Sequence, residues 1–181
     1  MQERSKLHQL ILLIAELLIA AVAVVLDVIT KKIAVNALKG GGHKAFLPGF
    51  IDFVYVENTG MAFGMAEGAR WFFITVTFVI IIAIAVYLIV LRKTVHPLTA
   101  VAMAMVVGGG IGNQIDRISL GYVVDFIHFD FDFPVLHEFP VFNVADSFVT
   151  VAAILLVISI IFFDKSVLTD DKKNKDKKCD E

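Results

Sequence analysis

The sequence predicts an α-helical membrane protein with four transmembrane helices and a small extracytoplasmic β-sheet. Of its 181 residues, 58% are hydrophobic and the mean hydropathy is +0.81, whereas a soluble domain is roughly 45–50% apolar. Four apolar runs lie at about 9–29, 71–91, 97–116 and 143–163. Each is long enough to cross a hydrocarbon core, which takes about 20 helical residues. The segments 46–57 and 122–133 are rich in β-forming residues and predict the sheet.

The distribution of charge predicts one membrane domain over 1–163, with outer loops at about 30–70 and 117–142, and a polar tail. An even number of spans places both termini on one side. That side carries ten of the sixteen Lys and Arg residues, six of them in the tail over 164–181. The positive-inside rule therefore predicts cytoplasmic termini, and the polar tail is expected to be disordered. The net charge of -2, with no basic stripe, gives no support for a nucleic-acid partner.

The first run, over 9–29, is expected to stay in the protein as a helix, because no small-x-small cleavage site follows it. Glu16, Ala23 and Asp27 fall on one face of that helix. Lys31 lies one turn beyond Asp27 and could pair with it. Ionisable groups at membrane depth are costly and often functional. The alternative is that Asp27 only ends the helix at the lipid headgroups.

The run over 97–116 carries a row of residues at every fourth position that ends in a carboxylate. The row is Ala100, Ala104, Gly108, Gly112 and Asp116. Small residues at this spacing let two helix backbones approach closely in lipid, and packing alone could explain the glycines. Asn113 and Arg117 flank the carboxylate. We therefore expect a polar site where this helix ends.

The segment 122–133 alternates with period two, which predicts a strand. Asp125 is the charged residue on its odd-numbered face, which is otherwise apolar, whereas His128 falls on the even-numbered face. A regular strand would turn Asp125 inward, where desolvation raises the pKa of a carboxyl group. A bulge would remove this inference.

The remaining polar positions flank the other two runs. Asn143 and Asp146 open the run over 143–163 as an N-cap and an acidic first turn, which capping alone could explain. Asn58 precedes the run over 71–91 in a glycine-containing loop. It could bond a peptide backbone, or belong to a plain turn. Trp71 is expected to anchor that run at the interface.

Several kinds of chemistry lack support in the sequence. The five histidines have no zinc-ligand spacing, Cys179 cannot form an internal disulfide, and no Gly-x-Ser-x-Gly elbow is present. A small ion-coupled transporter using Glu16, Asp27 and Asp116 is the rival interpretation. It is disfavoured because no repeat is evident and the polar groups gather at one interface. A structural subunit would leave those polar ends unexplained.

These motifs together resemble lipoprotein signal peptidase (signal peptidase II), a bacterial aspartyl peptidase family, from the first apolar run to about residue 163. The resemblance rests on five motifs in order: Asp27 with Thr30-Lys31; Asn58-Thr59-Gly60 through Ala62-Phe63-Gly64; Gly109-Gly110-Ile111-Gly112-Asn113 with Ile115-Asp116-Arg117; Gly121-Tyr122-Val123-Val124-Asp125-Phe126-Ile127; and Phe142-Asn143-Val144-Ala145-Asp146-Ser147. The stretch 128–140 and the lysine-rich tail look peculiar to this chain.

The resemblance implies the roles of the site residues. It implies a catalytic pair, Asp125 and Asp146, in a site lined by substrate-binding residues and held by supporting residues. The substrate-binding residues are Asn58, Asn113, Arg117 and Asn143, and the supporting ones are Asp27, Lys31 and Asp116. It also implies an inner-membrane enzyme with its site at the outer face and no metal or cofactor. The implied substrate is a prolipoprotein bearing diacylglycerol on the cysteine before which cleavage occurs, and globomycin-like cyclic peptides are the implied inhibitors.

Overall fold

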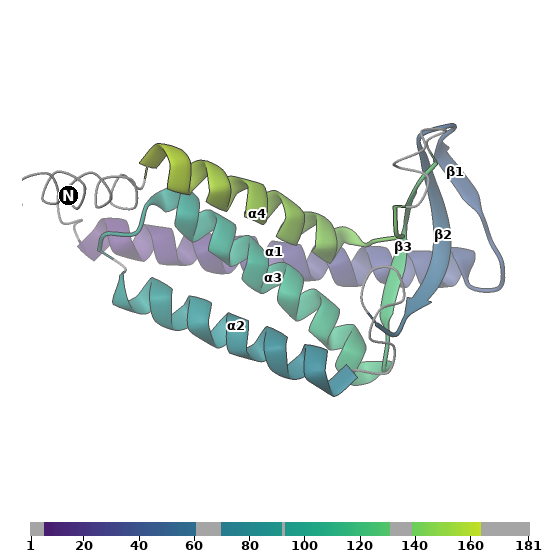
Figure 1. The fold of residues 1–181 in the computed structure, drawn as a ribbon, viewed down its shortest axis with the longest axis horizontal. Helices are drawn as coiled ribbons and strands as arrows, with labels where there is room; N and C mark the ends of the chain where they lie inside the picture. Colours follow the sequence, from purple (N-terminus) through teal and green to yellow (C-terminus); the bar gives the residue numbers. More distant parts are fainter. Residues whose placement is uncertain (1–5, 61–69, 92, 131–138, 164–181) are drawn as a thin grey trace, which may run out of the picture.

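The protein forms four long helices and a three-stranded sheet in a computed structural model that describes residues 6–60, 70–91, 93–130 and 139–163 (Figure 1). The helices are α1 (Lys6–Leu38), α2 (Arg70–Val90), α3 (Pro97–Ser119) and α4 (Val144–Phe163). Each is long and apolar enough to cross a membrane. The prediction of a four-span membrane protein with a small sheet is confirmed.

The helices run side by side, and the sheet lies at one end of them. The start of α1, the turn between α2 and α3 and the end of α4 lie at the opposite end, on the left of Figure 1. Helix α3 packs against α1 and α4 over most of its length and against α2 less extensively. Polar groups at the end of α3 and the start of α4 therefore meet next to the sheet.

The row of small residues on α3 explains this close packing. All five members of the predicted row, from Ala100 to Asp116, are buried. A Cβ atom added at Gly108 would lie 2.7 Å from the carbonyl oxygen of Ala20 in α1, and one added at Gly109 would lie 2.6 Å from that of Ala145 in α4. Helix α3 is thus held at backbone contact distance from both neighbours.

The sheet contains β1 (Lys44–Leu47), β2 (Ile51–Asn58) and β3 (Val123–Phe129) in the order β1-β2-β3, with both pairings antiparallel. The predicted segment 46–57 is divided between β1 and β2 by a tight turn, where Gly49 has a φ of 76° that favours glycine. The two β-rich segments thus form one sheet, as predicted.

Helix α1 is longer than the sequence predicted, and this changes the surroundings of β3. The helix continues past residue 29 to Leu38 and stops before Gly40, whose φ is 113°. Its last turns bury Ala34 and Leu38 against Phe126 of β3. Val124 and Phe126 on the even-numbered face are therefore buried as well, and both faces of the first half of β3 are covered.

Some predictions concern residues outside the described ranges. They include the expected disorder of the tail over 164–181 with Cys179, the end of the predicted strand at 131–133, and the loop residues 61–64.

Candidate active site

Two carboxylates from different elements border one cavity at the sheet end of the bundle. Asp125 lies in β3 and is 1% exposed, while Asp146 lies in the first turn of α4. The cavity has a volume of about 570 Å³, and Asn58, Arg117 and Phe73 also line it. The sequence prediction that Asp125 turns inward is confirmed.

Asn143 contacts both carboxylates. It caps α4: its Oδ1 accepts a hydrogen bond from the backbone N–H of Asp146 at 2.9 Å, and its own N–H donates to Asp146 Oδ2 at 3.2 Å. Its Nδ2 donates to Asp125 Oδ1 at 2.6 Å. Asn143 therefore both caps α4 and bonds to the two carboxylates, whereas the sequence alone left capping as a sufficient explanation.

Two further amides fix the orientations of the carboxylates. Asn113 on α3 donates from Nδ2 to Asp146 Oδ1 at 2.8 Å. Asn58 on β2 donates from Nδ2 to Asp125 Oδ2 at 2.8 Å, and its Oδ1 accepts the Gly60 N–H at 3.0 Å. Asp125 is thus held by the side-chain amides of Asn58 and Asn143, and Asp146 by the side-chain amide of Asn113 and the backbone N–H of Asn143, which restricts the rotation of both carboxylates.

The environment of Asp125 favours its neutral form. Burial raises the pKa of Asp125 to about 6, the hydrogen bonds from Asn58 and Asn143 oppose the shift, and the negative charge of Asp146 adds to it. Two carboxyl groups close together resist ionising simultaneously. The neutral form of Asp125 is therefore well populated up to about pH 6, well above the usual range of an aspartate.

Behind the cavity, a buried cation ties the elements together. Lys31 Nζ lies 2.7 Å from Asp27 Oδ2 and 3.0 Å from Asp116 Oδ2, and it donates to Asn113 Oδ1 at 2.8 Å. Asp27 Oδ1 accepts the backbone N–H of Ala145 in α4 at 2.9 Å. The predicted Asp27–Lys31 pair is confirmed, and it reaches the first turn of α4.

Asp116 performs the corresponding task for the strand. Its Oδ2 accepts the backbone N–H of Val124 at 3.0 Å, one residue before Asp125. Lys31, Asp27, Asp116 and Asn113 (the Lys31 network) therefore hold the segments that carry both cavity carboxylates.

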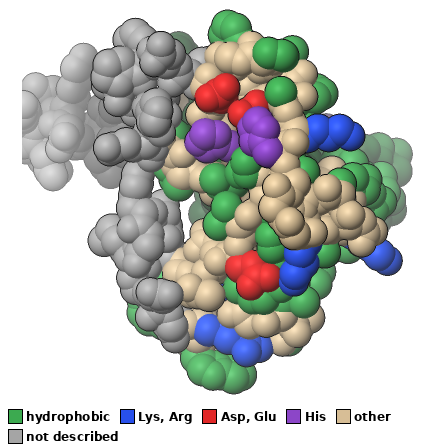
Figure 2. All heavy atoms as spheres, turned by 90° about the vertical axis from the view of Figure 1, so that its right-hand side faces the viewer, with side chains coloured by type: hydrophobic (Ala, Val, Ile, Leu, Met, Phe, Trp, Pro, Cys, Tyr) green, Lys and Arg blue, Asp and Glu red, His purple; other side chains and the backbone are tan. Residues whose placement is uncertain are grey.

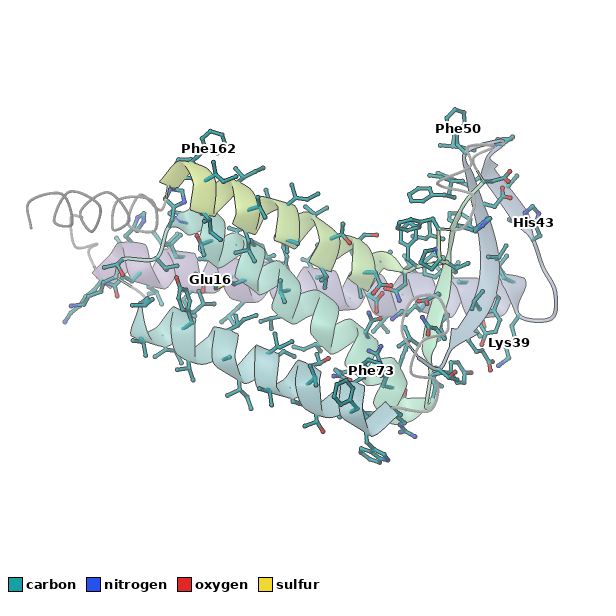
Figure 3. All side chains as sticks on the ribbon, viewed as in Figure 1. Glu16, Lys39, His43, Phe50, Phe73 and Phe162 are labelled. Atoms are coloured by element: carbon teal, nitrogen blue, oxygen red, sulfur yellow. The ribbon has the colours of Figure 1, made fainter. Side chains whose placement is uncertain are left out.

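Arg117 lines the cavity with its guanidinium 5.3 Å from the centre of the Phe73 ring, in a cation–π arrangement. Phe73 lies near the start of α2, at the sheet end of the bundle (Figure 3). Arg117 thus supplies positive charge at the same cavity as the two carboxylates.

Sequence reasoning missed how α2 is attached. The buried Gln114 donates from Nε2 to the carbonyl oxygens of Phe73 and Ile74, both at 3.2 Å, and Arg70 donates to the Ile118 oxygen at 2.9 Å. Gln114 is a further polar residue beside Asn113 near the end of the apolar run, and that was the available signal.

The structure brings all nine predicted site residues to the sheet end, but in two layers. Asn58, Arg117, Asp125 and Asp146 line the cavity. The side-chain amides of Asn113 and Asn143 bond to protein groups, including the two carboxylates. Whether these two asparagines also bind substrate stays a prediction.

Two other buried carboxyl groups lie apart from this cavity. Glu16 is at the opposite end of the bundle (Figure 3), where it lines a separate cavity of about 410 Å³ among α1, α2 and α3. Asp52 on β2 is 6% exposed and pairs with His43 at 2.7 Å. Figure 2 views the molecule from the sheet end and shows acidic and histidine side chains gathered over the sheet.

Comparisons with known proteins agree with the geometry. A family described as signal peptidase (SPase) II matches residues 19–162. Proteins named lipoprotein signal peptidase from Streptococcus pyogenes serotype M2 (strain MGAS10270) and serotype M5 (strain Manfredo) are each 38% identical over 160 residues, which cover 88% of this chain and 95% of theirs.

Solved structures show the same fold. Two structures, described as bacterial membrane enzymes determined by the in meso method at 2.3 and 1.9 Å resolution, are each 32% identical to the chain. Their TM-scores are 0.73 and 0.72; the matches cover 89% and 90% of this chain and 92% and 99% of theirs. By sequence and by fold, the chain belongs to the signal peptidase II family.

Proposed function

We propose that this protein is an aspartyl endopeptidase that removes signal peptides from diacylglyceryl-modified prolipoproteins, cleaving before the lipidated cysteine. The observation that carries the proposal is the meeting of Asp125 and Asp146 at one cavity, with Asn143 bonded to both. The names of the curated relatives supply the substrate class.

The chemistry is general acid–base attack of water on a peptide carbonyl. Asp146 sits at the start of α4, where the helix dipole and the hydrogen bond from the Asn143 N–H favour an anion, so it serves as the base that activates the water. Asp125 is buried and its pKa is raised to about 6, so it holds the shared proton and donates it to the carbonyl oxygen or the leaving amine. After each turnover the pair again holds one proton.

The surrounding residues then have distinct tasks. Asn58 and Arg117 line the cavity and contact the substrate, while Asn113 and Asn143 also orient the carboxylates. Asp27, Lys31 and Asp116 hold the segments that carry the pair. No metal or organic cofactor takes part in this mechanism.

The proposed location follows from the charge distribution. The protein lies in the bacterial inner membrane with cytoplasmic termini, which places the sheet and the cavity at the outer face. Membrane lipid surrounds the four spans, and cyclic peptides such as globomycin act as inhibitors by occupying the cavity.

Purified protein should cleave a diacylglyceryl-modified precursor peptide immediately before the cysteine, which the product mass reveals. The matched unmodified peptide should remain intact. Cleavage of both peptides alike, or cleavage at another bond, would contradict the proposed substrate class.

A further inference from the structure

The segment just before α4 extends the sheet on the far side of β3. Phe142 forms an antiparallel bridge with Ile127: its N–H donates to the Ile127 oxygen at 3.0 Å, and its carbonyl accepts the Ile127 N–H at 2.8 Å. The N–H of Phe126 also donates to the Phe142 oxygen, at 3.0 Å. Within the residues that the structure describes, the segment next to Phe142 therefore forms the outer edge of the sheet.

The backbone of Val141 is the next hydrogen-bonding position on that edge. In an extended chain, the N–H and C=O groups of successive residues point to opposite sides. Because those of Phe142 point toward β3, those of Val141 point away from it. Within the described part of the chain, the Val141 N–H and C=O take part in none of the hydrogen bonds.

This edge borders the cavity that contains the carboxylate pair. Pro140, Val141 and Phe142 line the cavity together with Asp125 and Asp146. Pro140 has no N–H, so Val141 supplies the peptide donor there. The segment leads directly into Asn143, the residue that bonds to both carboxylates. A peptide lying along the edge would therefore pass the proposed catalytic groups.

We propose that the cleavage-site segment of the substrate binds as an extended strand against Val141, pairing with its N–H and C=O. Addition of a strand to an exposed sheet edge is a general mode of peptide recognition, in which main-chain hydrogen bonds give affinity independently of side chains. This inference rests on the proposed peptidase function. It makes Val141 a positioning residue that binds the substrate through its backbone N–H and C=O rather than through its side chain.

The test compares two variants at this position by steady-state cleavage of the diacylglyceryl-modified precursor. Val141→Pro removes the N–H yet is compatible with extended backbone. Losing one hydrogen bond should raise KM and lower kcat/KM by roughly three- to tenfold. Val141→Ala keeps the N–H and measures what the shortened side chain alone costs, so the loss in Val141→Pro is counted relative to this variant. Equal activities of the two variants would overturn the proposal.

A series of precursors, each N-methylated at one peptide bond near the cleavage site, gives an independent readout with the unsubstituted enzyme. The C=O of Val141 accepts from one substrate N–H, so kcat/KM should fall for the precursor methylated at that one peptide bond and not for those methylated at its neighbours. This series decides the question if Val141→Pro fails to fold.

A uniform or absent effect of methylation would mean that the edge is occupied by lipid or water instead, and would reject strand pairing. These outcomes are separate from failure of the proposed function, which the unmethylated precursor reports directly. If that precursor is cleaved before the cysteine, the function stands whatever the methylation series shows.

Discussion

Replacing Lys31 by Met should destabilise the protein strongly. The Lys31 side chain is 4% exposed, and its ammonium lies 2.7 Å from Asp27 and 3.0 Å from Asp116. Methionine has a similar length, so packing is largely retained while the charge is lost. Removing one partner of a buried ion pair costs about 3–5 kcal/mol, because the remaining charge is left uncompensated. Here two buried carboxylates are left, so we expect a loss at the upper end of that range.

Lys39→Met is the matched control. Lys39 Nζ lies 3.1 Å from Glu57 Oε1, but the two side chains are 53% and 43% exposed. Solvent screens such surface pairs, so their removal has little effect on stability. The double variant Asp27→Asn with Lys31→Met should regain part of the stability, because it neutralises one of the two buried carboxylates that lost their cation.

The assay is reversible unfolding in mixed detergent micelles, followed by circular dichroism as the fraction of denaturing detergent rises. The predicted order of stability is unsubstituted protein and Lys39→Met together, then the double variant, then Lys31→Met. If Lys31→Met is as stable as Lys39→Met, the Lys31 network does not hold the site together and the reasoning is refuted.

Four other predictions concern packing, pH, metal and topology. Gly109→Ala would place a Cβ 2.6 Å from the Ala145 oxygen and should lower the melting temperature and the cleavage rate. Gly110→Ala is the control: the atom nearest to its Cβ would be a Thr77 methyl carbon at 3.3 Å, and both quantities should be nearly unchanged. Plotted against pH, kcat/KM should be bell-shaped, with limbs that belong to the coupled pair. It should fall as pH rises through about 6, because the pKa of Asp125 is raised to that value and its neutral form is present below it. A rate that still rises well above pH 6 would count against Asp125 as the acid. Cleavage should persist in excess EDTA and phenanthroline, and a loss that zinc restores would rule out a metal-free mechanism. Cys179 in intact cells should resist a membrane-impermeant maleimide that labels it after lysis, and labelling before lysis would reverse the proposed orientation.

The residues of the site could be predicted from sequence because the cost of burying polar groups in a membrane limits where they occur. Asp27, Asn113 and Asp146 stand out against apolar runs, and helical spacing predicted that Asp27 pairs with Lys31, which the structure confirms. Period-two alternation likewise placed Asp125 inward. The Asp27–Lys31 pairing needed only a local pattern, whereas both faces of β3 around Asp125 are buried, so alternation alone did not decide its burial.

The contacts between elements could not be predicted in the same way. No local pattern shows that Asn143 bonds to Asp125 across 18 positions, or that Asp27 accepts the N–H of Ala145 across 118. The extension of α1 to Leu38 was missed because the hydropathy pattern marks where the apolar run ends, whereas the helix stops only before the glycines that begin at Gly40. The buried even-numbered face of β3 depends on that extension.

The central claim is that Asp125 and Asp146 perform the cleavage, and single-turnover hydrolysis of the diacylglyceryl-modified precursor tests it most directly. Asp125→Asn and Asp146→Asn should each fold and insert but lose nearly all activity, because removing one member of a catalytic unit costs about as much as removing the whole. Asp52→Asn is the control, since Asp52 is also a buried carboxyl group at the sheet end but pairs with His43 outside the cavity lining. It should retain the rate of the unsubstituted enzyme. Substantial turnover by the Asp125→Asn or the Asp146→Asn variant, or an equally large loss of activity in Asp52→Asn, would contradict the assignment.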